Sequence, residues 1–287
     1  MAGVLIFGSR GFIGRRLISD LEGVGEFSMH TPFEGDVDIT NYEEVERYVK
    51  SIQPDFILNL AAASIPSDTD FSKFYLVNIL GARNILQAVD TVIRDCKVLL
   101  FSSAHVYGLA SGLLSEAQPV SPVSDYGISK AAMEMLPALF PAVEVSVVRP
   151  FNLIGRGQNP SLFLAKVIRH CIEEQPVLEV GDLALKRDFL DVRDASTAIC
   201  KLLTLPRWAQ GPVNICSGVS LGLGSLIEAT CEVTGWTPEI KSVERFKRST
   251  DAPVIRGDNR RLRSLIDWEP RFDLRDTLNW AVDCPPA

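Results

Sequence analysis

The stretch Val4-Leu5-Ile6-Phe7-Gly8-Ser9-Arg10-Gly11-Phe12-Ile13-Gly14 decides the fold of this 287-residue chain. The apolar run at 4–7 predicts a buried strand, and the periodic apolar residues of 11–21 predict a helix. Glycines between them leave room for a tight turn, for a pyrophosphate and for close helix–strand packing, while the helix N-terminus offers N–H donors to phosphate. A strand, a glycine-rich turn and a helix in this order predict a dinucleotide-binding site. Its expected cofactor-binding residues are Gly8, Arg10, Gly11, Phe12, Ile13 and Gly14.

The alternation of apolar runs and helical patterns continues outward from this stretch. Further strands are expected at residues 26–30, 56–60, 98–102 and 143–149, and helices at 42–52, 74–93 and 125–139. Continuous apolar strands separated by helices indicate a parallel sheet covered on both faces. The expected fold class is therefore α/β, a Rossmann-type doubly wound parallel sheet with a smaller C-terminal substrate-binding portion.

The pattern changes after Pro150. A loop-rich stretch at 155–160 precedes an expected helix at 162–174, a glycine-rich bend at 218–224 and a final helical segment after Asp273. We expect residues 1–152 to form the dinucleotide-binding domain, which also receives part of 188–218. Residues 153–287 are expected to form mainly the substrate-binding portion.

Charge and composition exclude several classes of protein. The net charge of −7 opposes nonspecific binding of nucleic acid, which needs a basic surface. No apolar run is long enough to span a membrane, and the N-terminus lacks the basic region of a signal peptide, so we expect a cytoplasmic protein. The six cysteines have no CxxC spacing, which predicts small buried side chains in a reducing compartment and no structural metal site.

Tyr126 and Lys130 form the candidate catalytic pair. A spacing of four places both side chains on one face of the expected helix. A nearby ammonium favours phenolate over phenol, so we expect Lys130 to lower the pKa of Tyr126. The alternative is an exposed aromatic–lysine pair without a catalytic role. Ser103 lies upstream, at the end of an expected buried strand.

Two segments after predicted strands extend the expected cofactor site. In Gly35-Asp36-Val37-Asp38-Ile39-Thr40, Asp38 is placed to accept a hydrogen bond from adenine, next to Ile39. The alternative is that these acids cap the helix at 42–52. In Asn59-Leu60-Ala61-Ala62-Ala63, small side chains let the backbone approach a bound cofactor. Leu60, Ala61 and Ala62 are therefore expected cofactor contacts.

The glycine spacing, the run at 54–62 and Val77-Asn78-Ile79-Leu80-Gly81 resemble extended short-chain dehydrogenases/reductases of the epimerase/dehydratase family, which act on nucleotide sugars. Ser102-Ser103-Ala104-His105-Val106-Tyr107-Gly108 resembles the family's Ser-Ser-x-x-Val-Tyr-Gly segment. The resemblance implies that Ser103 hydrogen-bonds the reacting sugar oxygen, that Tyr126 transfers its proton and that Lys130 tunes Tyr126. It also implies that Tyr126, Lys130 and Asn78 contact the cofactor.

Ala104 and His105 stand where the related 4,6-dehydratases carry an Asp-Glu pair that eliminates water. Alanine cannot donate a proton, so the resemblance predicts no dehydratase activity. His105 is expected to contact the substrate or to serve as a second acid/base. A plain loop histidine is the alternative.

Three further residues are expected to bind the substrate. Arg149-Pro150-Phe151-Asn152 resembles the family's Arg-Pro-x-Asn, whose Asn contacts the sugar nucleotide, and Arg187 lies in a segment that resembles the one facing the nucleotide. Arg248 matches a pyrophosphate-binding Arg-Pro-Gly-Asp segment, although Ser249 replaces the proline. Guanidinium groups suit phosphate because they donate two parallel bonds. The alternative for each arginine is a surface ion pair.

The C-terminal segment most resembles GDP-4-keto-6-deoxymannose reductases, so the leading hypothesis is a reductase of a nucleotide-linked 4-keto-6-deoxyhexose. The alternatives are a nucleotide-sugar 4-epimerase that retains NAD and a noncatalytic dinucleotide sensor. NADP(H) is favoured over NAD(H), because Phe27-Ser28-Met29-His30-Thr31 ends the second strand without an acid and Arg10 can meet a 2′-phosphate. A homodimer that packs the helices at 74–93 and 125–139 is also expected.

Overall fold

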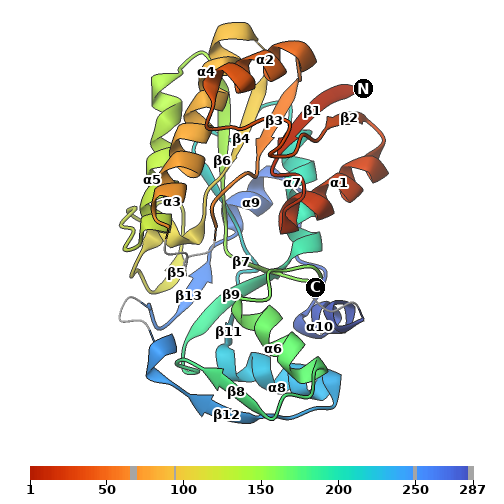
Figure 1. Ribbon diagram of the computed structural model, residues 1–287, viewed down its shortest axis with the longest axis vertical. Coiled ribbons are helices and arrows are strands. Elements are labelled where there is room, and N and C mark those ends of the chain that lie inside the picture. The colour runs from red at the N-terminus through yellow and green to blue at the C-terminus, as the bar shows by residue number, and fades with distance from the viewer. Residues whose placement is uncertain (65–69, 94, 248–250, 284–287) are drawn as a thin grey trace. The chain divides into compact units, whose positions relative to one another are not determined.

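The structure is a computed structural model that describes residues 1–64, 70–93, 95–247 and 251–283 (Figure 1). The chain divides into two compact units, and each is described by itself. The first comprises Met1–Gly108, Gln118–Pro150 and Ile199–Asn214, and the second comprises Leu109–Ala117, Phe151–Ala198 and Ile215–Ala287. The assignment of cofactor binding to residues 1–152 and of substrate binding to residues 153–287 stays a prediction.

A six-stranded sheet forms the centre of the first unit, in the order β10-β6-β4-β3-β1-β2. The strands are β1 (Ala2–Phe7), β2 (Phe27–His30), β3 (Phe56–Asn59), β4 (Lys97–Phe101), β6 (Glu144–Pro150) and β10 (Pro212–Ile215). The pairs β1–β2, β1–β3, β3–β4 and β4–β6 are parallel. The order reverses between β1 and β3, which is where open α/β sheets bind ligands. The predicted α/β Rossmann class is confirmed.

Helices cover both faces of this sheet. Figure 1 shows α4 (Ala82–Val92) and α5 (Asp125–Met135) along one side of the strands, and α1 (Phe12–Val24) along the other. Helix α7 (Val192–Leu203) begins in the second unit and ends in the first. Side chains alternate between the two faces along each strand. Leu5, Ile57 and Leu100 point to the same face, where they share an apolar core with residues of α4, α5 and α2 (Tyr42–Ile52). Burial on both faces explains why the strands are apolar throughout.

The single helix expected at 74–93 is wrong in detail. The segment consists of α3 (Ser72–Tyr75), a π-helix η1 (Leu76–Gly81) and α4. Gly81 packs so closely on Ile39 that an added Cβ would lie 2.5 Å from Cδ1 of Ile39. This contact joins residues far apart in sequence, so the local pattern does not reveal it.

The helix expected at 125–139 also ends early. α5 stops at Met135 and a 3-10 turn, η3 (Leu136–Leu139), follows it. Pro137 lies at the start of η3, where its missing N–H and its ring prevent continuation of the α-helical hydrogen bonds.

The second unit combines short sheets with a group of three packed helices. The sheets are β11-β9-β7, β12-β8 and β13-β5. Their strands are β5 (Gly112–Leu114), β7 (Asn152–Ile154), β8 (Val177–Val180), β9 (Lys186–Asp191), β11 (Ser220–Gly222), β12 (Glu239–Ser242) and β13 (Ile255–Gly257). The helices α6 (Phe163–Ile172), α8 (Leu223–Thr234) and α10 (Leu274–Val282) share one apolar core, and α9 (Arg260–Leu265) and the turn η4 (Glu244–Phe246) complete the unit.

The glycine-rich bend expected at 218–224 is confined to its start, where Gly218 bends the chain with a φ of +82°. Ser220–Gly222 forms strand β11, antiparallel to β9, and α8 begins directly after it. Leu221 and Leu223 pack on the core of the three helices, which orders a stretch that its glycines alone would leave irregular.

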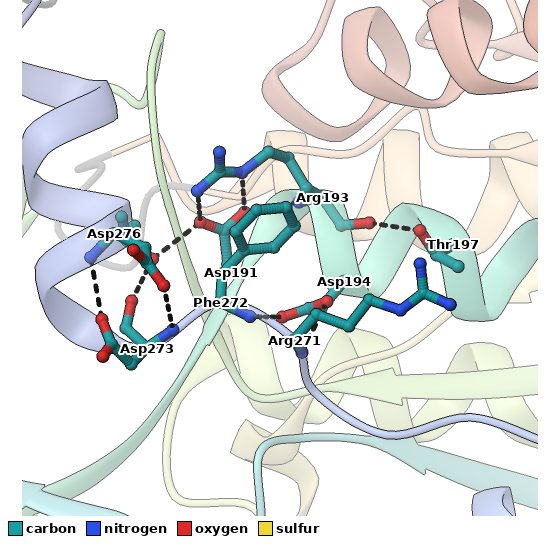
Figure 2. Close-up of polar contacts among 9 residues, drawn as sticks. Asp191, Arg193, Asp194, Thr197, Arg271, Phe272, Asp273 and Asp276 are labelled. Carbon is teal, nitrogen blue, oxygen red and sulfur yellow. Dashed lines mark hydrogen bonds and ion pairs between the residues drawn. The ribbon is translucent and has the colours of Figure 1, made fainter.

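A charged and aromatic cluster fastens the C-terminal helix to the junction of β9 and α7, within the second unit (Figure 2). The guanidinium of Arg193 donates to both carboxylate oxygens of Asp191 and lies 3.5 Å from the ring centroid of Phe272. Asp194 accepts from the backbone N–H groups of Arg271 and Phe272. Asp273 then caps α10, as the predicted final helix requires.

Within the described ranges, no helix is both long enough and apolar enough to cross a lipid bilayer.

Candidate active site

Close backbone contacts shape the glycine-rich turn after β1. Gly8 has a φ of +78°, and a Cβ on it would lie 2.5 Å from the backbone N of Ala61. A Cβ on Gly14 would lie 2.5 Å from the carbonyl O of Ser9. Gly11, at the N-cap of α1, is exposed and accepts a bond from the N–H of Arg15. The turn therefore needs glycine for the reasons that the sequence indicated.

The N-terminus of α1 suits a phosphate group. In the described part of the chain, α1 begins without a side-chain cap and its first turn holds no acidic residue. Its first N–H groups and the positive end of its dipole can therefore bind an anion. Phe12 and Ile13 occupy this first turn, half-buried. These residues fit the pyrophosphate of a dinucleotide.

Arg10 lies against the segment that follows β2. Its guanidinium carbon is 4.5 Å from the ring centroid of Phe33. The backbone N–H of Phe33 donates to the carboxylate of Asp36 at 3.1 Å, which closes the turn carrying the ring. The Arg10 cation is thus held near the place where NAD-preferring sites carry their ribose-binding acid.

Asp38 and Ile39 lie just before α2. Neither Asp36 nor Asp38 caps this helix. The cap is Asn41, whose side chain accepts from the N–H of Glu44. The Oδ1 atom of Asp38 accepts from both the N–H and the hydroxyl of Thr40, each at 2.8 Å. The capping alternative is therefore wrong. Ile39 is buried beneath the π-helix, so the adenine contact of Asp38 and the cofactor contact of Ile39 stay predictions.

Asn78 fastens the loop after β3. Its Oδ1 accepts from the N–H of Ala63 at 3.0 Å, and its Nδ2 donates to the carbonyl O of Ala63 at 3.1 Å and to the hydroxyl of Ser129 at 2.9 Å. This buried amide sits in the π-helix and joins the loop to the helix that bears Tyr126. Leu60, Ala61 and Ala62 are half-buried in the same loop. Asn78 therefore holds the loop in place, and its direct contact with a cofactor stays a prediction.

Ser103 and Tyr126 lie within hydrogen-bond reach of each other. Ser103 is buried where β4 ends, and its hydroxyl also accepts from the N–H of His105 at 3.2 Å, which caps the short turn η2 (Ala104–Tyr107). Burial raises the pKa of the Tyr126 phenol, and the hydrogen bond with Ser103 opposes this shift. The ring of His105, an exposed residue, stands edge-on to that of Tyr126, with centroids 5.2 Å apart.

Lys130 is buried rather than exposed, which rules out the alternative of a surface pair. Its ammonium donates to the carbonyl O of Phe101 at 2.7 Å. Burial lowers the pKa of Lys130 to about 8, and the carboxylate of Glu134 opposes this shift. The expected lowering of the Tyr126 pKa by Lys130 is therefore wrong for the chain without ligands, since burial of the phenol dominates.

The sequence analysis missed Glu134. Its carboxylate forms a buried ion pair with Arg149 and also accepts from the hydroxyl of Ser102, the neighbour of Ser103. A signal existed, since Glu134 follows Lys130 by four residues on the same helix. Its ion-pair partner, Arg149, lies on strand β6, so the pair is visible only in the fold.

The expected substrate residues belong to the second unit. Asn152 donates to the carbonyl O of Asp188 at 2.8 Å. The guanidinium of Arg187 is mostly buried and binds the carbonyl O of Ala252 at 2.7 Å and a carboxylate oxygen of Asp251 at 3.1 Å. Arg187 thus forms an ion pair, but not a surface one. Arg248 lies outside the described residues.

Asp188 was also missed. Its buried carboxylate accepts from the N–H groups of Ser217, Gly218 and Gly257 and from the Ser217 hydroxyl. Burial raises its pKa, while these bonds oppose the shift. The Asp188 side chain therefore connects β9 with the segments at 217–218 and 257, next to Asn152. Among the described residues, no group of three or more His, Cys, Asp or Glu side chains is arranged to hold a metal ion.

Comparison with known proteins decides the family. Residues 4–216 match the family described as the NAD dependent epimerase/dehydratase family. The chain belongs to this family. The predicted membership among NAD(P)-dependent, extended short-chain dehydrogenases/reductases is confirmed, and with it the prediction that the chain is an enzyme.

Curated relatives of this family member include proteins above 30% identity. GDP-6-deoxy-D-talose 4-dehydrogenase of Aggregatibacter actinomycetemcomitans is 33% identical over 273 residues, which cover 94% of this chain and 92% of the relative. GDP-6-deoxy-D-mannose reductase of Pseudomonas aeruginosa is 31% identical over 238 residues, 78% of each protein. UDP-glucuronate 4-epimerase of Thermodesulfobacterium geofontis is 24% identical over 259 residues, 86% of this chain and 78% of the relative.

Solved structures of the family carry either nicotinamide cofactor. RMD from Pseudomonas aeruginosa complexed with NADPH has a TM-score of 0.88 at 27% identity, covering 99% of this chain and 98% of that one. UDP-glucose 4-epimerase of Thermus thermophilus complexed with NAD has a TM-score of 0.87 at 24% identity, covering 98% of each, and shows the common fold.

Proposed function

We propose that this family member reduces the 4-keto group of a nucleotide-linked 4-keto-6-deoxyhexose. The observation that carries the proposal is the grouping of Ser103, Tyr126 and Lys130 in the first unit, with the Ser103 hydroxyl close enough to oppose the rise in the Tyr126 pKa and Lys130 one helical turn further on. Two relatives above 30% identity are named a 4-dehydrogenase and a reductase of GDP-linked 6-deoxyhexoses. Those names support a redox reaction at C4 of such a sugar.

The protonation state of Tyr126 favours reduction. Because burial raises its pKa, the phenol keeps its proton at neutral pH and can act as a general acid. A bound nicotinamide cofactor supplies the hydride to the carbonyl carbon. Ser103 donates a hydrogen bond to the ketone oxygen, and Tyr126 gives that oxygen its proton as negative charge develops. The buried Lys130 ammonium, on the same helix face, stabilises the phenolate that remains.

The proposed cofactor is NADPH, with NADH the alternative. Arg10 supports NADPH because its guanidinium rests on Phe33, just beyond the stretch 27–31 that ends β2 without an acid for the ribose 2′-OH. Gly8 and Gly14 support a dinucleotide in either form, since neither position has room for a side chain.

The proposed substrate contacts are Asn152, Arg187 and Arg248 of the second unit and His105 of the first. His105 is exposed beside Tyr126, which suits contact with a sugar hydroxyl. Arg187 must exchange its bonds to Ala252 and Asp251 to meet a phosphate or base. Positions 104 and 105 hold Ala and His instead of the Asp-Glu pair that eliminates water. The proposed substrate is therefore a ketone that another enzyme has formed.

A 4-epimerase with retained NAD is the second candidate, favoured by the relative named UDP-glucuronate 4-epimerase. One assay separates the two. The purified enzyme is mixed with NADPH and a nucleotide-linked 4-keto-6-deoxyhexose bearing GDP, UDP or dTDP, and absorbance loss and product are followed together. We expect stoichiometric oxidation of NADPH with at least one nucleotide, and none with Tyr126→Phe. Conversion of a UDP-sugar to its C4 epimer without added cofactor, and no oxidation of NADPH, would establish the epimerase instead.

We also propose a homodimer through η1 and the α5–η3 segment. Leu76 and Leu80 of η1 and Ile128, Met135 and Leu139 of α5–η3 are exposed, with Met135 at 74%. Their inward neighbours are buried in the unit's own core, so these apolar side chains form a separate outer face. Such a face marks a protein interface more often than a solvated surface.

A further inference from the structure

Glu134 is the centre of a buried polar network that the proposed chemistry does not use directly. Its Oε1 accepts from Nε of Arg149 at 2.9 Å and its Oε2 accepts from Nη2 at 2.6 Å. The side chains of Arg149 and Glu134 are 4% and 11% exposed. A two-point ion pair with this little solvent is geometrically fixed, because both charges depend on it for compensation.

The network reaches the strand that carries Ser103. The hydroxyl of Ser102 donates to Oε1 of Glu134. On the other side, Nη1 of Arg149 donates to the hydroxyl of Tyr107 at 3.0 Å, and Tyr107 donates to Oδ1 of Asn214 at 2.6 Å. The carboxylate thus binds Ser102 directly and is linked to Tyr107 through Arg149, which connects the end of β4 and the turn η2 to α5.

The same carboxylate acts on Lys130. The two residues are four apart on α5, and the ammonium is buried with the carbonyl O of Phe101 as its hydrogen-bond acceptor. A carbonyl dipole alone compensates a buried cation poorly, whereas a carboxylate one turn away opposes its deprotonation. The other titratable groups around them are Tyr126 of α5, Tyr107 and His105 of η2, and Arg149 of β6.

We infer that Glu134 is a positioning residue for the proposed catalytic set: its one carboxylate fixes the strand end that presents Ser103 and keeps the buried Lys130 side chain charged. The inference rests on the proposed roles of Ser103 and Lys130. It makes no demand on the identity of the sugar.

The first test measures the charge on Lys130 without any substrate. The full chain is isotopically labelled at its lysine side-chain carbons, the Lys130 signal is identified by its loss in Lys130→Met, and its pKa is read from an NMR titration. In the wild type we expect a value near 8. In Glu134→Gln, which keeps the shape and removes the charge, we expect the pKa to move down. An unchanged pKa would overturn the electrostatic part of the inference, whether or not the enzyme reduces ketosugars.

The second test separates position from charge. Glu134→Asp keeps the charge but draws the carboxylate back from Ser102, so we expect kcat to fall about 10- to 100-fold with NADPH affinity unchanged. The matched control is Asp20→Asn, which breaks the Arg16–Asp20 ion pair of α1 and should leave kcat as in the wild type. Wild-type kcat in Glu134→Asp would overturn the positional part. If Glu134→Gln is not recovered folded, the Lys130 pKa is read in Glu134→Gln combined with Arg149→Met, which removes the buried ion pair as a whole. A Lys130 pKa below the wild-type value supports the electrostatic part, and an unchanged value overturns it.

Discussion

Replacing Lys130 with methionine should remove a pH-dependent cost from the stability of the ligand-free protein while abolishing its activity. Burial lowers the Lys130 pKa from 10.5 to about 8. Below about pH 8 the lysine is protonated in both folded and unfolded chains, so the folded state bears the full cost of a buried ammonium. Above about pH 10.5 the lysine is neutral in both states, and this cost disappears. The cost corresponds to about 3 kcal/mol, at about 1.4 kcal/mol per pKa unit.

Methionine removes this cost but leaves the carbonyl O of Phe101 without its donor, a loss of about 1–3 kcal/mol that does not depend on pH. The sign of the net change at one pH is therefore less informative than its slope. Relative to the wild type, Lys130→Met should lose about 3 kcal/mol of unfolding free energy between pH 7 and pH 10.5.

Urea unfolding of both proteins without cofactor, over this pH range and at fixed ionic strength, measures the difference. Groups that titrate in both proteins cancel, because only position 130 differs. Lys50→Met, at an exposed lysine of α2, is the matched control and should show no such slope. A difference between Lys130→Met and the wild type that stays constant with pH would refute the assignment of a buried, destabilised ammonium.

Three further predictions concern the cofactor, the chemistry and the assembly. Tyr126→Phe should lower kcat at least about 100-fold and leave NADPH affinity, measured by fluorescence titration, unchanged; retention of about a tenth of the activity would move the acid role elsewhere. Arg10→Ala should weaken NADPH about 10- to 100-fold and NADH hardly at all, and equal losses of kcat/KM for both would count against a 2′-phosphate site. Met135→Lys with Leu139→Lys should convert a dimer at micromolar concentration into a monomer by sedimentation, and a wild-type monomer would contradict the interface.

Local requirements were predictable from the sequence. Gly8 and Gly14 are fixed by contacts within a few residues or with the adjacent strand end, and the first-unit strands are apolar because both sheet faces are covered. The helix Tyr42–Ile52 was predicted with its observed bounds, since its apolar period and its flanking residues are local signals. The family resemblance added the roles of Ser103 and Tyr126.

Properties set by distant residues were not predictable. Gly81, the last residue of the π-helix, packs on the distant Ile39, and the pKa values of Tyr126 and Lys130 depend on their burial in the fold. The importance of Glu134 becomes visible only once β6 brings Arg149 to it. Arg187 looked like a ligand or a surface charge, but its partners come from residues 251 and 252, far along the chain.

The first unit has a consequence for biosynthesis, because its edge strand is encoded late. β10 (Pro212–Ile215) joins the sheet beside β6, and Asn214 supplies the acceptor for the Tyr107 hydroxyl. A nascent chain that has reached Pro150 therefore presents β6 with an unpaired edge until the ribosome has delivered β10, which follows residues 151–198 of the second unit. Residues 1–150 therefore lack an edge strand of their own sheet, and a fragment ending at Pro150 would expose the hydrogen-bonding edge that promotes association between chains.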